Sequence, residues 1–391
     1  MSTHQRDTKL DHIRVDHVGG LPRPAWLRDI QARFDDGGVS AEELEAEQRR
    51  AVGAVIARQE ELGLPIVTDG EFTRHNFQES FGGAVTGFDA TPARYARRIE
   101  TGQAQTPDGD AVPTVRAPSG MNEPGPAILH RRPVVERLRL TRNLILEEYQ
   151  RATSLSATPV KVTLTGPDRI SQRFAYESSR SVYRDMDEFL QDVVAIERQM
   201  IAEVVAAGCR YVQIDEPGYT AYVDGPSLET MRARGEDPDQ NLARSIAADN
   251  ALTHDFEGVT FGIHICRGGG GGRGGTWFHR EGSYDAIAER LYSQLDFDRF
   301  LLEYDSDAAG GFDSLRYMPK GKSAVLGLVS NHGDVETTDY LKRRLEEASA
   351  YVSLEYAAVC PRCGFGGARD EQKVWQKFEI LQEVAAEVWG A

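Results

Sequence analysis

The chain predicts an α/β protein, a single (β/α)8 barrel, on three observations. Short apolar segments alternate with longer helical patterns along the 391 residues. Eight such apolar segments can be counted, and helical patterns lie between most of them. His, Asp or Glu residues lie near the carboxyl ends of several of these segments, at the face where barrel enzymes place their sites. A doubly wound open sheet is the alternative that this alternation also allows.

The eight expected strands are four to eight residues long, and most are rich in Val, Ile or Leu. If the sheet closes, the first and last strands adjoin and all carboxyl ends share one face. In chain order the expected strands are Ile13–Val18, Pro65–Thr68, Val160–Leu164, Tyr211–Ile214, Val259–Ile265, Phe300–Tyr304, Ala324–Val329 and Tyr356–Val359.

The helical segments between them carry end signals. Ser40 is a plausible N-cap for a helix over Ala41–Leu62, with Glu43 at the capping-box position. Gly208 is a typical residue just beyond the end of a helix over Asp187–Ala207. The remaining expected helices are Ser283–Leu295, Thr337–Tyr351 and Asp370–Trp389.

Two segments fall outside this repeat. Residues 84–135 are rich in Gly, Pro, Thr and Asp and lack sustained periodicity, so we expect a long insertion after the second strand. The glycine-rich run 268–275 is either a lid or a loose loop, and no Lys-Ser/Thr follows it to make a phosphate loop. The chain is otherwise expected to form one domain over residues 1–391.

The net charge and the composition argue against some classes of binding partner. A formal net charge of -16 argues against nucleic acid and against an anionic membrane surface. Four cysteines do not make a disulfide framework, the first residues lack an apolar signal region, and no stretch reaches membrane-spanning length. We therefore expect a cytoplasmic protein with small-molecule partners, and a homo-oligomer remains open.

The motif with the clearest chemistry is His264-Ile265-Cys266, at the end of the fifth expected strand. Residues two apart on a strand point to the same side, so His264 and Cys266 would offer an imidazole and a thiolate to one point. Zinc prefers such ligands in tetrahedral geometry. Glu303 ends the next expected strand and Cys363 follows the last one, which makes them candidates for the other two ligands.

Simpler interpretations exist for each of these residues. A lone His-x-Cys is often a chance pattern, and a lone cysteine is usually a small buried hydrophobe. Cys360 and Cys363 could instead form a redox pair or half of a zinc knuckle, although no second CxxC completes one. Cys209 precedes a strand and is expected to be a buried structural residue.

Carboxylates and an arginine also follow expected strands. Asp215 and Glu216 close the fourth strand, where they could bind an amine, act as a base or support a metal ligand. A helix-capping role before Pro217 is the alternative. Glu71 and Arg74 follow the second strand and would reach the same face.

Several short motifs occur in the order found in one known family. They are V-G-G-L-P-R-P at 18–24, D-G-E-F-T-R at 69–74, L-T-G-P at 164–167, Q-I-D-E-P at 213–217, H-I-C at 264–266, the Glu of L-L-E-Y-D at 301–305, and P-R-C-G at 361–364. On these motifs the chain resembles the catalytic barrel of the cobalamin-independent methionine synthases, a fold related to uroporphyrinogen decarboxylase.

The resemblance implies a catalytic zinc held by His264, Cys266, Glu303 and Cys363. It also implies that Glu71 and Asp215 hold the amino group of an amino-acid thiol such as homocysteine, and that His332 serves proton transfer.

Two positions depart from the family pattern. Gly20 stands where the family has a Ser that holds homocysteine, and Arg173 lies near the place of a folate-stacking aromatic. Arg74 and Arg173 are among the arginines that could bind a carboxylate or sulfonate.

The implied reaction is an S-alkyl transfer, in which zinc binds a small-molecule thiol as thiolate for attack on a methyl or alkyl donor. Transfer of a methyl group from 5-methyltetrahydrofolate to homocysteine is the leading form. Addition of a thiol to an epoxide, as in the epoxyalkane:coenzyme M transferases, is a second. A metal-free decarboxylase-like enzyme and a non-catalytic zinc- or ligand-binding barrel are further alternatives.

Overall fold

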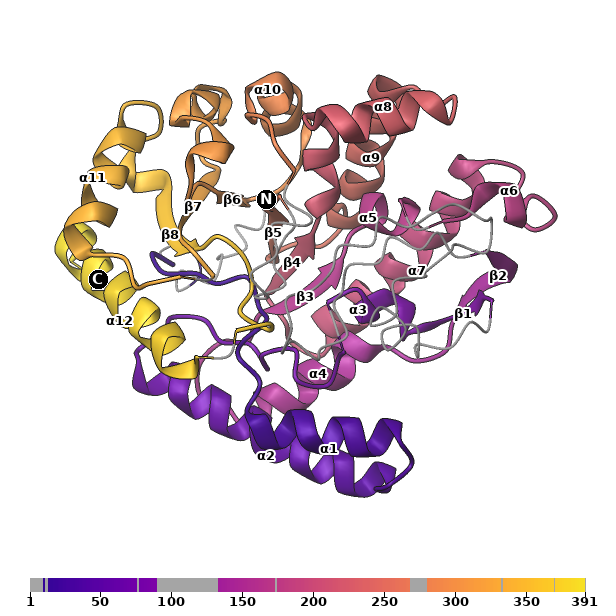
Figure 1. Ribbon diagram of the computed structural model, residues 1–391, viewed down its shortest axis with the longest axis horizontal. Coiled ribbons are helices and arrows are strands. Elements are labelled where there is room, and N and C mark those ends of the chain that lie inside the picture. Colours follow the sequence, from indigo (N-terminus) through magenta and orange to yellow (C-terminus); the bar gives the residue numbers. More distant parts are fainter. Residues whose placement is uncertain are drawn as a thin grey trace.

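A parallel sheet of six strands forms the centre of the protein, in the order β3-β4-β5-β6-β7-β8 (Figure 1). The computed structural model describes residues 10, 13–75, 77–89, 133–172, 174–267, 280–331, 333–368 and 370–390. Every neighbouring pair in this sheet is parallel, and helices lie around the outside of the strands. The strands are β3 (Val162–Thr165), β4 (Tyr211–Asp215), β5 (Thr260–Ile265), β6 (Arg299–Glu303), β7 (Ser323–Val329) and β8 (Ala357–Pro361).

The α/β prediction is confirmed, and the first two expected strands are reduced to single bridges. Val15 forms a parallel bridge with Val359 of β8, and Val67 forms one with Val160 just before β3. These two segments therefore extend the sheet at its opposite edges. Downstream of them the backbone amide of Leu21 donates to the carbonyl of Gly70 at 3.2 Å, which brings the two segments together.

The helices follow the predicted signals where the sequence carried them. Ser40 and Glu43 form a complete capping box at the start of α2, and Asp185 caps α7. The α-helices are α1 (Ala25–Asp35), α2 (Ala41–Glu61), α3 (Glu79–Gly82), α4 (Leu144–Thr153), α5 (Pro167–Ser171), α6 (Tyr176–Ser179), α7 (Met186–Ala206), α8 (Gly225–Ala233), α9 (Pro238–Thr253), α10 (Asp285–Gln294), α11 (Thr338–Ser349) and α12 (Glu371–Trp389). The short 3-10 helices are η2 (Pro217–Tyr222), η3 (Asp307–Ala309), η4 (Phe312–Tyr317) and η5 (Leu354–Tyr356).

The expected insertion begins and ends in a small sheet of its own. Strand β1 (Val85–Phe88) pairs antiparallel with β2 (Val134–Leu140), apart from the central sheet. Residues 90–132, most of the expected insertion, lie outside the described residues, as does the glycine-rich run 268–275.

A buried polar network lies at the amino-terminal ends of the central strands. It consists of Asp16, Lys161, Tyr211 and Arg299, and we call it the interior network. Asp16 pairs with Lys161 at 2.6 Å and with Arg299 at 3.2 Å, and the Tyr211 hydroxyl donates to it at 2.7 Å. Tyr211 and Arg299 are the first residues of β4 and β6. The interior network therefore lies at the opposite end of the strands from their carboxyl ends.

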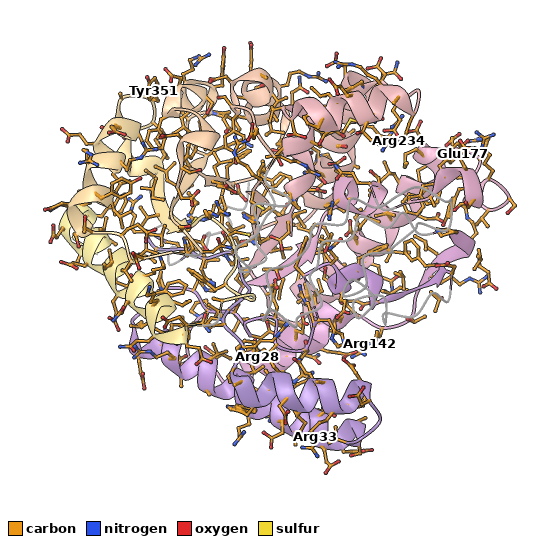
Figure 2. The ribbon with its side chains drawn as sticks, in the orientation of Figure 1. Arg28, Arg33, Arg142, Glu177, Arg234 and Tyr351 are labelled. Carbon is orange, nitrogen blue, oxygen red and sulfur yellow. The ribbon has the colours of Figure 1, made fainter. Side chains whose placement is uncertain are left out.

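Many charged side chains lie at the surface of the molecule. In Figure 2 the labelled side chains of Arg33, Glu177 and Tyr351 lie at the outer margin of the molecule, beyond the ribbon. Exposed ion pairs such as Arg142 with Glu147 occur at this surface and contribute little to stability. Among the described residues, no helix combines the length and the apolar composition that crossing a bilayer requires.

Candidate metal centre and amine site

The carboxyl ends of β4, β5, β6 and β8 bring the predicted residues toward one place. In the parallel register Asp215 of β4 lies opposite His264 of β5. Cys266 follows β5 directly and Cys363 comes two residues after β8 ends at Pro361. All strand ends of a parallel sheet point the same way, so residues distant in sequence meet at this edge.

Three side chains form a cluster able to hold a metal ion. The ligand atoms of His264, Cys266 and Cys363 all lie within 4.8 Å of one another, and no other such group occurs among the described residues. The two sulfur atoms are 3.9 Å apart. Two thiolates bound to one tetrahedral zinc at about 2.3 Å would lie about 3.8 Å apart, whereas a disulfide needs about 2.05 Å. The donor set and its spacing therefore fit zinc.

Glu303 lies beside this cluster but is held by other groups. It is fully buried at the end of β6. Its Oε2 accepts the backbone amide of Arg267 at 2.9 Å, and its Oε1 pairs with the Arg362 guanidinium at 3.2 Å. Its place as a fourth ligand stays a prediction, since the compact group contains only the imidazole and the two sulfurs.

The cluster is electrostatically coupled. The Cys363 thiol donates to the Cys266 sulfur and lowers the pKa of Cys266 well below its ordinary value, and His264 acts in the same direction. Burial disfavours the imidazolium, but the Cys266 thiolate and Asp215 more than offset it and raise the pKa of His264 to about 10. Without metal, the site therefore favours a thiolate beside an imidazolium, and the thiolate is the form that binds metal.

The other two cysteines are structural. Cys360 lies in a small apolar cluster with Val18, Leu301, Val325 and Ala358, and burial raises its pKa. Burial likewise raises the pKa of Cys209 to about 12, and its thiol faces the carbonyl of Tyr211 at 3.3 Å. Cys360 and Cys363 form no disulfide, and the Cys363 sulfur instead faces Cys266.

A second group of acids lies next to the cluster. Asp215 Oδ1 is 3.4 Å from His264 Nδ1. Glu71 accepts a hydrogen bond from the Thr163 hydroxyl at 2.9 Å, and burial together with Asp215 raises the pKa of Glu71 against the opposing effect of Arg74. Two neighbouring buried carboxylates of this kind are suited to an ammonium group.

Glycine at position 20 gives the Glu71 carboxylate its room. A Cβ at Gly20 would lie 3.2 Å from Glu71 Oε2, which is closer than an ordinary contact. Glu71 itself has a positive φ of 59°, an uncommon conformation for a residue other than glycine. The departure from the family's Ser at position 20 therefore accompanies a close approach by the acid.

Arg74 lies beside Glu71 and is bound by other groups of the protein. It is buried, pairs with Glu148 at 2.6 Å, donates to the carbonyl of Thr163 at 2.8 Å, and lies 3.6 Å from Glu71. The guanidinium is thus engaged by protein groups, which differs from the expected reach toward a substrate. His332 and Arg173 lie outside the described residues, so their predicted roles stay predictions.

Glu216, the neighbour of Asp215, points elsewhere. Its carboxylate accepts the backbone amides of Asp168 at 2.8 Å and Arg169 at 3.0 Å, at the start of α5. A Cβ at Gly166 would lie 2.0 Å from Glu216 Oε1, so the glycine of the L-T-G-P motif makes room for this contact. The expected cap on the segment that begins at Pro217 is absent, because the Glu216 side chain binds the first amides of α5.

Sequence reasoning missed the residues that support the site. Arg362 holds the Glu303 carboxylate beside Cys363, and Gln213 donates to Asp215 Oδ1 at 2.7 Å. The position of Arg362 between two cysteines was a signal available in the sequence. Gln213 precedes Asp215 by two on one strand, so the period-two rule could have found it.

The chain is similar to known proteins over most of its length. The model of the cobalamin-independent synthase catalytic domain matches residues 15–108 and 127–269. The uncharacterized protein YxjG of Bacillus subtilis (strain 168) is 31% identical over 389 residues, covering 96% of this chain and 95% of that protein. The methionine synthase of Pyrococcus abyssi (strain GE5 / Orsay) is 23% identical over 352 residues, covering 89% and 84%.

A solved structure shows the same fold. The putative vitamin-B12 independent methionine synthase from Listeria monocytogenes superposes with a TM-score of 0.72 at 23% identity, covering 97% of this chain and 98% of that chain. Fold and matches together define an α/β enzyme with a methyltransferase-like function. The chain belongs to the cobalamin-independent methionine synthase family. Zinc binding is a general property of that family, and this chain carries a matching His/Cys cluster.

Proposed function

We propose that the protein is a zinc-dependent S-alkyltransferase that methylates an amino-acid thiol. The observation that carries the proposal is the cluster of His264, Cys266 and Cys363, with its sulfur atoms 3.9 Å apart. Glu303 would complete the ligand set from its position beside Arg362. A zinc ion bound there would favour the thiolate form of a substrate thiol at neutral pH.

The chain's own residues would hold the substrate. Glu71 and Asp215 are buried carboxylates next to the His/Cys cluster. They would bind the ammonium group of an amino acid such as homocysteine. Burial of the pair keeps water away and strengthens its interaction with a cation. His332 would donate a proton to the leaving group. The proposed methyl donor is 5-methyltetrahydrofolate.

We further propose that the sheet closes as a (β/α)8 barrel and that residues 1–391 make one catalytic domain with an insertion after the second strand position. The bridges at Val15 and Val67 support closure, since they add a strand position at each edge of the six-stranded sheet. A small-molecule thiol and an alkyl donor are the proposed partners. A homo-oligomer and a cytoplasmic location are compatible with this proposal.

Metal content with two cysteine variants tests the site. The wild-type protein should bind about one zinc per chain. Cys363→Ser should lose most of this metal, because a ligand is removed. The matched control is Cys360→Ser, three residues away, which should keep the metal because the Cys360 side chain packs in the apolar cluster around Leu301. Equal zinc in all three proteins, measured by inductively coupled plasma mass spectrometry, would overturn the zinc proposal.

A panel of thiols tests the substrate class. Zinc-edge absorption spectra should gain a Zn–S path on adding homocysteine, because a catalytic zinc keeps a position for an exchangeable ligand. Coenzyme M would give the stronger response if the chain were of the epoxyalkane transferase type. No change with any thiol would favour a non-catalytic zinc barrel, and full activity without metal would favour a decarboxylase-like enzyme.

A further inference from the structure

A continuous hydrogen-bonded chain of buried side chains connects the interior network to the candidate site. Lys161 Nζ lies 2.6 Å from Asp16 Oδ1 and 2.9 Å from Gln213 Oε1. Gln213 Nε2 in turn donates to Asp215 Oδ1 at 2.7 Å. Lys161, Gln213 and Asp215 are 2%, 0% and 3% exposed, so water does not compete for these contacts.

The contacts of Gln213 allow only one orientation of its amide. The Lys161 ammonium has donors and no acceptor, so it must face the amide oxygen. On the other side, Gln213 Nε2 meets the Val18 carbonyl at 2.7 Å and the Asp215 carboxylate at 2.7 Å. Both of these groups accept, so they must face the amide NH2. Turning the amide over would leave these three buried contacts mismatched, which is costly.

The Asp215 carboxylate is thereby fixed at one oxygen. Among the described residues, the contacts given by Gln213 and His264 both fall on Oδ1. A carboxylate held by one oxygen keeps a defined plane, and its second oxygen then has a defined direction. A fixed acceptor of this kind loses little conformational freedom when a ligand binds, which favours affinity.

We propose that Lys161 and Gln213 are positioning residues that orient Asp215 for the ammonium group of the thiol substrate. This inference rests on the proposed function. Lys161 acts through Gln213, since it sets which end of the amide faces Asp215. The result is selectivity for thiols that carry an amino group over thiols that lack one.

Isothermal titration of the zinc-loaded protein with two thiols tests the inference. The probes are homocysteine and 4-mercaptobutyrate, which has the same carbon chain and carboxylate but no amino group. Gln213→Met keeps side-chain length and removes the donor to Asp215. It should weaken homocysteine binding by about 10- to 100-fold, as loss of a supporting partner does at metal sites, and leave 4-mercaptobutyrate binding unchanged.

Lys161→Met tests the second link. It should weaken homocysteine binding in the same selective way, and the double variant should bind homocysteine no more weakly than Gln213→Met alone, because both changes act through one contact. The matched control is Tyr211→Phe, on the same strand as Gln213, whose hydroxyl reaches Asp16 and not Gln213. It should leave the ratio of the two affinities unchanged. If Lys161→Met does not fold, Gln213→Met alone decides.

The outcomes separate this inference from the proposed function. Wild-type protein that binds neither thiol overturns the proposed function and the inference with it. Wild-type protein that prefers homocysteine, with the preference retained in Gln213→Met, overturns the inference alone. An equal loss for both thiols in Gln213→Met, or an altered affinity ratio in Tyr211→Phe, also overturns it, since each would show general damage in place of positioning.

Discussion

Two groups of buried ionisable side chains differ in how they accommodate a carboxyl group that is removed from water. In the interior network Asp16 has two cationic partners, Lys161 and Arg299. The second group, which we call the acid cluster, joins α5, α7, α9 and the residue after β4, and consists of Asp168, Glu197, Glu216 and Asp249. None of the described ion pairs includes Glu197 or Asp249, and neither oxygen of Glu197 has a hydrogen-bond partner in the described chain.

The difference teaches how partners decide the charge of a buried acid. Burial alone would raise the pKa of Asp16, but Lys161 and Arg299 hold it well below its usual range. Burial raises the pKa of Glu197 well above its usual range, and the negative charge of Asp249 adds to this. The interior network is therefore held by charge, whereas burial favours the protonated forms of Glu197, Glu216 and Asp249.

The largest expected effect comes from breaking the paired network. Asp16→Asn leaves two buried cations without a negative partner and should lower the free energy of unfolding at pH 7 by about 3–5 kcal/mol. Urea denaturation measures it. The control is Asp239→Asn, which removes an ion pair with Arg290 from a side chain that is 88% exposed and should cost less than about 1 kcal/mol. Similar losses in both variants would contradict the comparison.

The acidic side of the pH profile follows from the same residue. A lowered pKa means that Asp16 contributes stability above its unfolded value near 3.8 and that this stability is lost as the pH falls below that value. Asp16→Asn should therefore be affected less than the wild type by acidification below pH 3.8. A wild-type profile with the same acid limb as the variant would show that Asp16 is not held by its cations.

The second effect is a decrease of stability as the pH rises above 4.5. The raised pKa of Glu197 makes the native state bind a proton that the unfolded state loses above its ordinary pKa of 4.5. Stability should therefore fall as the pH rises above 4.5, by about 1.4 kcal/mol per pH unit for each such group. Glu197→Gln should match the wild type near pH 4 and become the more stable protein at higher pH.

Chemical denaturation at a series of pH values checks this prediction. The control is Glu229→Gln, an exposed glutamate on α8 that should leave the slope unchanged. Glu197→Gln with the wild-type slope would mean that Glu197 is charged in the native protein, and the contrast between the two groups would fail.

Local sequence signals could predict much of the fold and the metal cluster. Alternation placed His264 and Cys266 on one side of β5, and the strand ends brought Cys363 to them, because parallel strands end at one edge. The capping box of α2 was visible because its partners lie three residues apart. These features depend on neighbours close in sequence or on one simple rule of topology.

The partners of the buried acids could not be predicted in that way. Glu216 and Asp215 are adjacent, yet Asp215 faces the site while Glu216 accepts amides of α5. The contact from Lys161 to Gln213 depends on the register of β3 with β4, and the one from Arg74 to Glu148 depends on where α4 packs. Such contacts join residues distant in sequence, and no local pattern encodes them.

The smallest effect compares two tyrosines that each donate to a buried aspartate. Tyr211 donates to Asp16 and Tyr219 donates to Asp249. Replacing either by Phe should cost about 1 kcal/mol, the usual net value of one hydrogen bond. The two variants should differ in pH dependence. Tyr211→Phe should give the same loss from pH 5 to 8, because Lys161 and Arg299 still keep Asp16 charged.

Tyr219→Phe should instead depend on pH. The Tyr219 hydroxyl lowers the pKa of Asp249 against the larger effect of burial, so its removal lets that pKa rise further. The native state then holds the Asp249 proton to a higher pH, and stability falls with rising pH over a wider range. Thermal denaturation of both variants at matched pH values distinguishes them. Parallel profiles would mean that the Tyr219 hydroxyl does not control the titration of Asp249, and the contrast between the two aspartates would fail.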